Sequence, residues 1–168
     1  MKKILSVALA ALMLVAMMLP AMAEGEVKLG QAIFAAHGTK CFAVITVALQ
    51  DDVIVDAYID EFQMMTAGEA VGVPNSEVMI EVEGKVLGSK RVNAAAYSEN
   101  MKKAGSTVAI DANYDAIEAY VTGKTVAELE TEVNAKSAEE MIDAVAGCTL
   151  ADTLGYINGI IDAAKNVK

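Results

Sequence analysis

Residues 42–61 read FAVITVALQDDVIVDAYIDE, and this stretch decides the fold. The run 42–49 is apolar and rich in β-branched residues, as a buried strand requires. Residues 50–52 are polar, and residues 53–61 then alternate between apolar and polar side chains. Two such runs around a short polar turn predict a β-hairpin.

The beginning of the chain has the three parts of a secretory signal peptide. Lys2 and Lys3 are basic, residues 4–19 are apolar, and the ending Ala21-x-Ala23 has small residues at the two positions that a signal peptidase reads. The alternative is an uncleaved membrane anchor, but a spanning helix needs about 20 apolar residues. We therefore expect residues 1–23 to be a signal peptide and residues 24–168 to be a single exported domain.

The charge balance excludes one class of partner. The chain has 13 basic and 23 acidic residues and a formal net charge of −10 at pH 7. A nucleic-acid-binding protein needs a basic patch or stripe, so we expect no nucleic-acid partner. No second apolar run is long enough to span a bilayer, so we expect no direct membrane insertion after cleavage. The predicted location is secreted, or at the extracellular or periplasmic cell surface.

Few residues offer reactive chemistry. Cys41 and Cys148 permit one disulfide in an oxidising compartment, and two buried thiols are the alternative. With one histidine, His37, the sequence predicts no metal site and no catalytic nucleophile. A plain loop is the favoured setting for His37. Contact with a bound phosphate is the alternative, because Gly38 and Thr39 beside it offer N–H and hydroxyl donors. Three carboxylates at the end of the hairpin are expected to face solvent: Asp56, Asp60 and Glu61.

The chain between the hairpin and the helices gives weaker signals. Residues 66–77 contain glycine, proline and asparagine and are predicted to form a loop. Residues 78–87 alternate between apolar and polar side chains, which predicts a strand, and Gly84-Lys85 is placed to turn it into a second, smaller hairpin.

From about residue 93 the apolar spacing becomes helical. Thr125-x-x-Glu128 and Ser137-x-x-Glu140 are capping boxes, which mark helix starts. Five helices are predicted, with these apolar positions: Tyr97 and Met101; Tyr114, Ile117 and Val121; Val126, Leu129 and Val133; Met141, Ile142 and Val145; Leu154, Ile157 and Ile161. Strands followed by helices predict an α+β fold, with an antiparallel sheet built from the N-terminal hairpin and packed with C-terminal helices.

One segment has a pattern with chemical meaning: residues 143–149, Asp-Ala-Val-Ala-Gly-Cys-Thr. It predicts a helix end, a glycine turn and a hydroxyl, on Thr149, at the N-cap of the last helix. Thr149 as a plain cap is one interpretation. The other is an anion site, because the unpaired N–H groups of Leu150 and the next two residues would favour a phosphate on Thr149 Oγ. Gly147 would leave room for a bulky group on this phosphate. Asp143 is a candidate metal ligand while such a group is being attached to Thr149.

The segment resembles the flavinylation motif Asp-x-x-(Ser/Thr)-Gly-Ala-Thr of FMN-binding domains. These domains occur in the flavin subunits of bacterial ion-pumping oxidoreductases and in surface proteins of extracellular electron transfer. The chain matches at Asp143, Gly147 and Thr149, and it has Ala146 and Cys148 where the family has Ser/Thr and Ala. Further segments that resemble the family are residues 42–62, 90–104, 114–129 and 163–165.

The resemblance implies a function. FMN would be linked by a phosphoester to Thr149, attached by a flavin transferase that uses FAD and Mg²⁺. The cofactor site would comprise Asp143, Ala146, Gly147, Cys148, Thr149 and Leu150. Such a domain carries electrons between redox partners in the membrane or at the cell surface and has no substrate of its own. The alternatives are a module that binds a flavin or small ligand non-covalently and a flavin-free interaction domain.

Overall fold

The structure is a computed structural model and describes residues 25–168. The predicted signal peptide, residues 1–23, lies outside this part of the chain. Within residues 25–168, no helix has both the length and the hydropathy needed to cross a bilayer.

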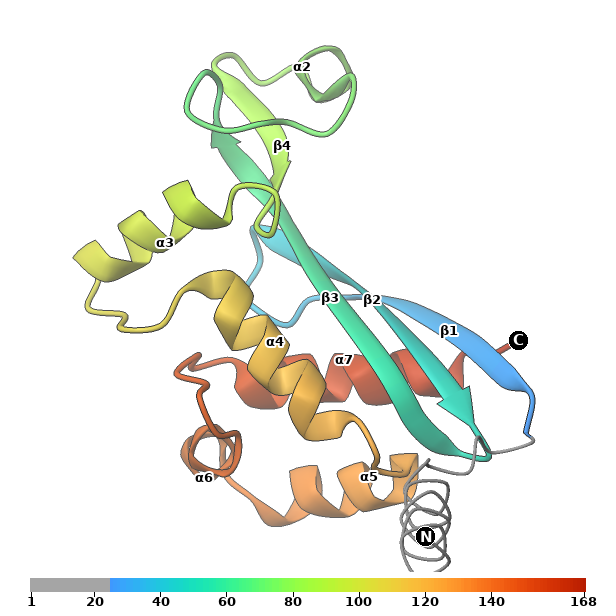
Figure 1. Cartoon of the computed structure of the whole chain (residues 1–168). Helices are drawn as coiled ribbons and strands as arrows, with labels where there is room; N and C mark the ends of the chain where they lie inside the picture. Colours follow the sequence, from blue (N-terminus) through green and yellow to red (C-terminus); the bar gives the residue numbers. More distant parts are fainter. Residues whose placement is uncertain (1–24) are drawn as a thin grey trace, which may run out of the picture.

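Four antiparallel strands form one sheet in the order β1-β2-β3-β4 (Figure 1). The predicted hairpin is confirmed as β2 and β3, whose paired ends Gln50 and Val53 enclose a two-residue turn. Asp51 and Asp52 both have positive φ angles, 51° and 65°, as hairpin turns of this length require. The strands are β1 (Val27–Phe34), β2 (Cys41–Gln50), β3 (Val53–Thr66) and β4 (Lys85–Ser89).

The strand predicted over residues 78–87 is wrong in its first part. Ser76–Met79 forms a short helix, α2, and β4 begins only at Lys85. The side chains of Val78 and Met79 are 76% and 77% exposed, so their alternation has no buried face to hold a strand.

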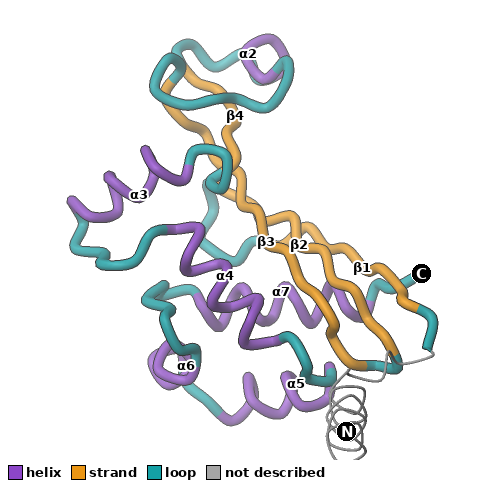
Figure 2. The backbone as a smooth tube through the Cα atoms, viewed as in Figure 1, coloured by secondary structure: helices purple, strands orange, loops and turns teal. Residues whose placement is uncertain are grey.

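Helices fill the second half of the chain, as predicted (Figure 2). Both capping boxes are formed, at Thr125–Glu128 and Ser137–Glu140, so the starts of α5 and α6 are confirmed. The helices are α3 (Ala94–Lys103), α4 (Ile110–Val121), α5 (Val126–Ala135), α6 (Ala138–Ala144) and α7 (Thr153–Lys165).

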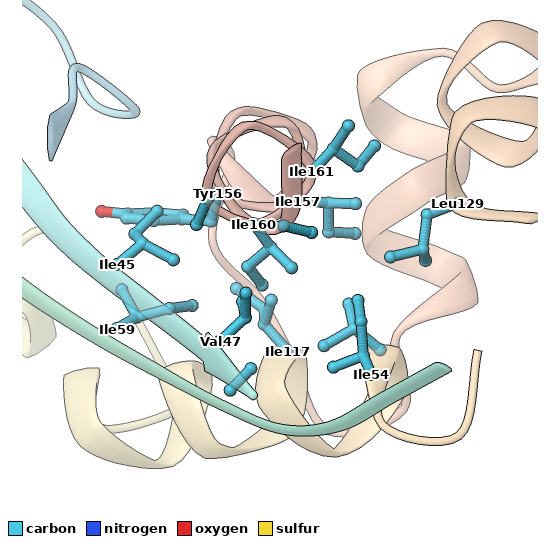
Figure 3. Close-up of a cluster of buried hydrophobic side chains, with 14 of the residues drawn as sticks. Ile45, Val47, Ile54, Ile59, Ile117, Leu129, Tyr156, Ile157, Ile160 and Ile161 are labelled. Carbon is cyan, nitrogen blue, oxygen red and sulfur yellow. The ribbon is translucent and has the colours of Figure 1, made fainter. Parts of the chain in front are cut away.

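The core lies between one face of the sheet and helices α4 and α7 (Figures 1 and 3). Ile45 and Ile59 from the sheet, Ile117 from α4 and Ile157 from α7 are fully buried there. Side chains that alternate with these along the strands point to the other face, where Leu29 is 61% exposed. The fold is therefore α+β, with an antiparallel sheet that carries the C-terminal helices.

Candidate functional site

The motif segment forms the loop between α6 and α7. Asp143 lies near the end of α6 and is exposed, as are Ala146 and Gly147. Gly147 has a φ of 87°, and a Cβ there would meet only Ala116 Cβ, at 3.9 Å. Glycine is therefore favoured at this position by the left-handed backbone, not by a lack of space.

Two motif residues anchor the loop instead of facing solvent. Cys148 is 7% exposed, and its Sγ lies 3.1 Å from Thr153 Oγ1. Leu150 packs against the core, and its carbonyl accepts hydrogen bonds from the Thr153 hydroxyl (2.6 Å) and N–H (3.2 Å). The residues immediately before and after Thr149 are therefore both packed against the protein interior.

Thr149 itself is exposed, and it does not cap α7. The helix begins at Thr153 with Asp152 at the N-cap, so the predicted N-cap at Thr149 is wrong. A turn closed by the bond from Thr153 N–H to the Leu150 carbonyl precedes the helix and separates Thr149 from it.

Asn113 holds Thr149 from the neighbouring helix α4. The Thr149 N–H donates to Asn113 Oδ1 over 2.7 Å, and Thr149 Oγ1 lies 3.4 Å from the same oxygen. The sequence pattern does not by itself assign Asn113 to this site. Its signal is an amide at helical spacing in a buried apolar stripe, between Ile110 and Ile117.

Three consecutive N–H groups beside Thr149 are available to an anion. In the described chain, the N–H groups of Leu150, Ala151 and Asp152 make no hydrogen bond. They precede the 13-residue helix α7, whose dipole favours negative charge at this end. The carboxylate of Asp152 lies at the same end and is paired with Nδ1 of His37. His37 lies in the loop between β1 and β2, as predicted, and this contact places its ring at the same end of α7.

The structure also contains a buried ion pair. Glu61 and Lys90 are fully buried and form a salt bridge, so the expectation that Glu61 faces solvent is wrong. Glu61 Oε2 also accepts hydrogen bonds from Tyr156 (2.8 Å) and Tyr114 (3.3 Å). Burial lowers the pKa of Lys90, but the hydrogen bond to Glu61 and its charge outweigh burial, and the pKa is raised overall.

Cys41 lies between the ion pair and His37. Its thiol donates to the carbonyl of His37, and burial together with the charge of Glu61 raises the pKa of the thiol to about 11. Cys41 and Cys148 are both free thiols, so the disulfide that the sequence permits is not formed in this structure.

The structure also has a cavity of about 460 Å³ between β3, β4 and α3. Tyr97 lines it, and the ammonium group of Lys90 lies 4.7 Å from the centroid of the Tyr97 ring. Three methionines, several amides and the charged residues Glu69 and Lys85 also line it, whereas Thr149 does not contribute. An aromatic ring, thioethers and amides suit a planar ligand with polar edges. The main lining residues are Gln63, Met64, Met65, Asn93, Tyr97, Asn100 and Met101.

Among residues 25–168, no group of three or more His, Cys, Asp or Glu side chains is arranged to hold a metal ion. Comparisons with protein-family models, curated proteins and solved structures found no match. The resemblance to FMN-binding domains therefore stays a prediction from the sequence.

Proposed function

We propose that this chain is an extracytoplasmic electron carrier with FMN linked through a phosphoester to Thr149. The observation that supports the proposal is the setting of the Thr149 hydroxyl. It is exposed beside three N–H groups that make no hydrogen bond, in the segment that precedes the 13-residue helix α7. Those donors would neutralise part of a phosphodiester charge.

The residues present fit such a group. Thr149 Oγ would carry the phosphate, and the N–H groups of Leu150, Ala151 and Asp152 would be hydrogen-bond donors for it. The exposed Ala146 and Gly147 leave the loop open to solvent. FMN supplies the redox chemistry when bound, and the protein supplies attachment and position. The Asp152 carboxylate, at the same end of α7, forms a hydrogen bond with Nδ1 of His37.

A direct test is co-expression with a flavin transferase in the presence of FAD and Mg²⁺, followed by intact mass measurement under denaturing conditions. Wild-type protein should gain one FMN phosphoester. Thr149→Ser keeps the hydroxyl and should be modified, whereas Thr149→Val should stay at the mass of the bare chain. Because Thr149 caps no helix, Thr149→Val should change the free energy of unfolding by less than about 0.5 kcal/mol.

Three results would change the proposal. A wild-type mass that never increases would rule out covalent flavin. Flavin on Thr149→Val would mean that another residue carries the link. Yellow colour that is lost on denaturation would favour the second candidate, which is non-covalent binding of a planar ligand.

The observation that favours this second candidate is the cavity between β3, β4 and α3. Its volume of about 460 Å³ is within the usual range for small-molecule sites, roughly 300–1,000 Å³. Titration of the purified protein with riboflavin, followed by quenching of the flavin fluorescence, tests this function. Tyr97→Ala removes the only aromatic ring among the lining residues and should abolish quenching by the cavity.

A further inference from the structure

We propose that Asn113 is a positioning residue that holds Thr149 Oγ ready for flavin attachment; this role rests on the proposed function. Asn113 is fully buried in the first turn of α4, whereas Thr149 is exposed on the neighbouring loop. Its side chain is the only one in the described chain that hydrogen-bonds to Thr149.

The orientation of the Asn113 amide follows from its partners. Nδ2 donates to the carbonyl of Val108 over 3.2 Å and to the carbonyl of Ala109 over 2.9 Å. Carbonyls only accept and the Thr149 N–H only donates, so a flipped amide would lose all three bonds. Oδ1 must therefore face Thr149, and it is fixed by the backbone at the start of α4.

This orientation sets the direction of the Thr149 hydroxyl. The hydroxyl proton points toward Oδ1, 3.4 Å away, so the lone pairs of Oγ are turned away from Asn113. In attachment, Oγ forms a bond to the flavin-side phosphorus of FAD and the pyrophosphate P–O bond to that phosphorus breaks. AMP leaves, and the hydroxyl proton is released. Asn113 holds the nucleophile in place, and the transferase supplies the reacting phosphate.

Ser98 provides a matched control for this role. Its hydroxyl accepts a hydrogen bond from the N–H of Ile110 over 3.0 Å, in the same first turn of α4, and it does not contact Thr149. Ser98→Ala therefore weakens the start of α4 without changing any contact of the loop between α6 and α7 that contains Thr149. Asn113→Leu and Asn113→Ala weaken the same turn and also release Thr149.

The experiment measures the rate of flavin attachment to full-length chain by a flavin transferase, below the melting transition of every variant. Both Asn113 variants should react at least about tenfold more slowly than wild type, through a lower kcat at an unchanged KM for the acceptor chain. Ser98→Ala should react at close to the wild-type rate. Asn113→Asp keeps the acceptor oxygen and should recover part of the loss.

A second measurement does not depend on flavin. Hydrogen exchange of the Thr149 amide, followed by NMR, should be slow in wild type and in Ser98→Ala and at least about tenfold faster in Asn113→Ala. Asn113 variants that match Ser98→Ala in attachment rate or in Thr149 exchange would overturn the role of Asn113 alone. A wild-type chain that never gains flavin would overturn the proposed function, and this role with it.

Discussion

Glu61 and Lys90 are an unusual pair for a core, because charges are seldom fully buried without a dense set of partners. Glu61 Oε2 has three donors, whereas Glu61 Oε1 is buried with no hydrogen-bond partner. The thiol of Cys41 lies within the electrostatic reach of this carboxylate. The pair is therefore held by one oxygen of Glu61 and leaves the other poorly solvated.

This arrangement predicts strong coupling between the two residues. Glu61→Leu leaves the Lys90 ammonium buried without its counter-charge and should lower the free energy of unfolding by about 3–5 kcal/mol. Lys90→Met should cause a loss of similar size. The double variant should lose clearly less than the sum, because it removes both charges. Urea unfolding of the four proteins measures the coupling, and additive losses would contradict it.

Gly147 has a left-handed backbone conformation that only glycine adopts without strain. Alanine there would have to adopt a φ of 87°, which should cost about 1 kcal/mol of stability. Gly123 has a φ of 86°, with no atom close to where a Cβ would be, so Gly123→Ala should cost a similar amount. If the Gly147 turn presents Thr149, only Gly147→Ala should slow flavin attachment. Equal attachment rates in the two variants would show that the turn has no such role.

At the scale of elements, the contact between β1 and α7 depends on a glycine. A Cβ on Gly30 would collide with the backbone carbonyl of Ala163 in α7, which cannot rotate away as a side chain could. Gly30→Ala should therefore lower the free energy of unfolding by about 1–3 kcal/mol. Gln31→Ala, on the exposed face of the same strand, should stay within about 0.5 kcal/mol of wild type. Thermal unfolding of both variants tests this, and equal melting temperatures would contradict it.

The same contact explains why β1 could not be predicted from the sequence. Its two buried positions are the small residues Gly30 and Ala32, and α7 packs closely against Gly30. The larger apolar residues Val27, Leu29 and Ile33 lie on the exposed face, where a strand is expected to be polar. The side chains do alternate between the two faces of β1, but the large apolar residues are on the exposed face instead of the buried one. The β2–β3 hairpin was predictable because its buried positions do carry the large residues.

The candidate site, like β1, could be predicted from the sequence only in part. Local signals correctly placed the glycine turn at Gly147, because it depends on neighbouring residues. The start of α7 was misplaced, because an extra turn inserts before Thr153. Asn113 was not assigned to the site from the sequence, and His37 only as the less favoured alternative, because their contacts with the loop span 36 and 115 residues along the chain.

At the scale of the whole molecule, a continuous line of contacts joins the loop of Thr149 to the cavity. Asp152 pairs with His37, whose carbonyl accepts from Cys41. Cys41 is next to Glu61, Glu61 pairs with Lys90, and Lys90 lies over the Tyr97 ring at the cavity. The two candidate functions therefore use ends of one polar network. A substitution at its centre is expected to affect both.

This network predicts how stability depends on pH. The pKa of Cys41 is raised from 9.0 to about 11, and burial with the charge of Glu61 also raises the pKa values of Tyr114 and Tyr156 above 10.0. The pKa of Lys90 is raised above 10.5. All four groups hold their protons more tightly in the folded chain than in the unfolded chain. Their contribution to stability is therefore complete below about pH 9 and is lost as the pH rises through the folded values.

Urea unfolding between about pH 8 and pH 11 tests this sign, because the free energy of unfolding should fall steadily above about pH 9. Cys41→Ala removes the group with the lowest unfolded pKa of the four, so its fall should begin about one pH unit higher, near the ordinary pKa of tyrosine. Gln31→Ala, which lies outside the network, should follow the wild-type curve. A wild-type free energy that stays level up to pH 11 would contradict tighter proton binding in the folded chain, and the polar network would then not be coupled to folding as its contacts indicate.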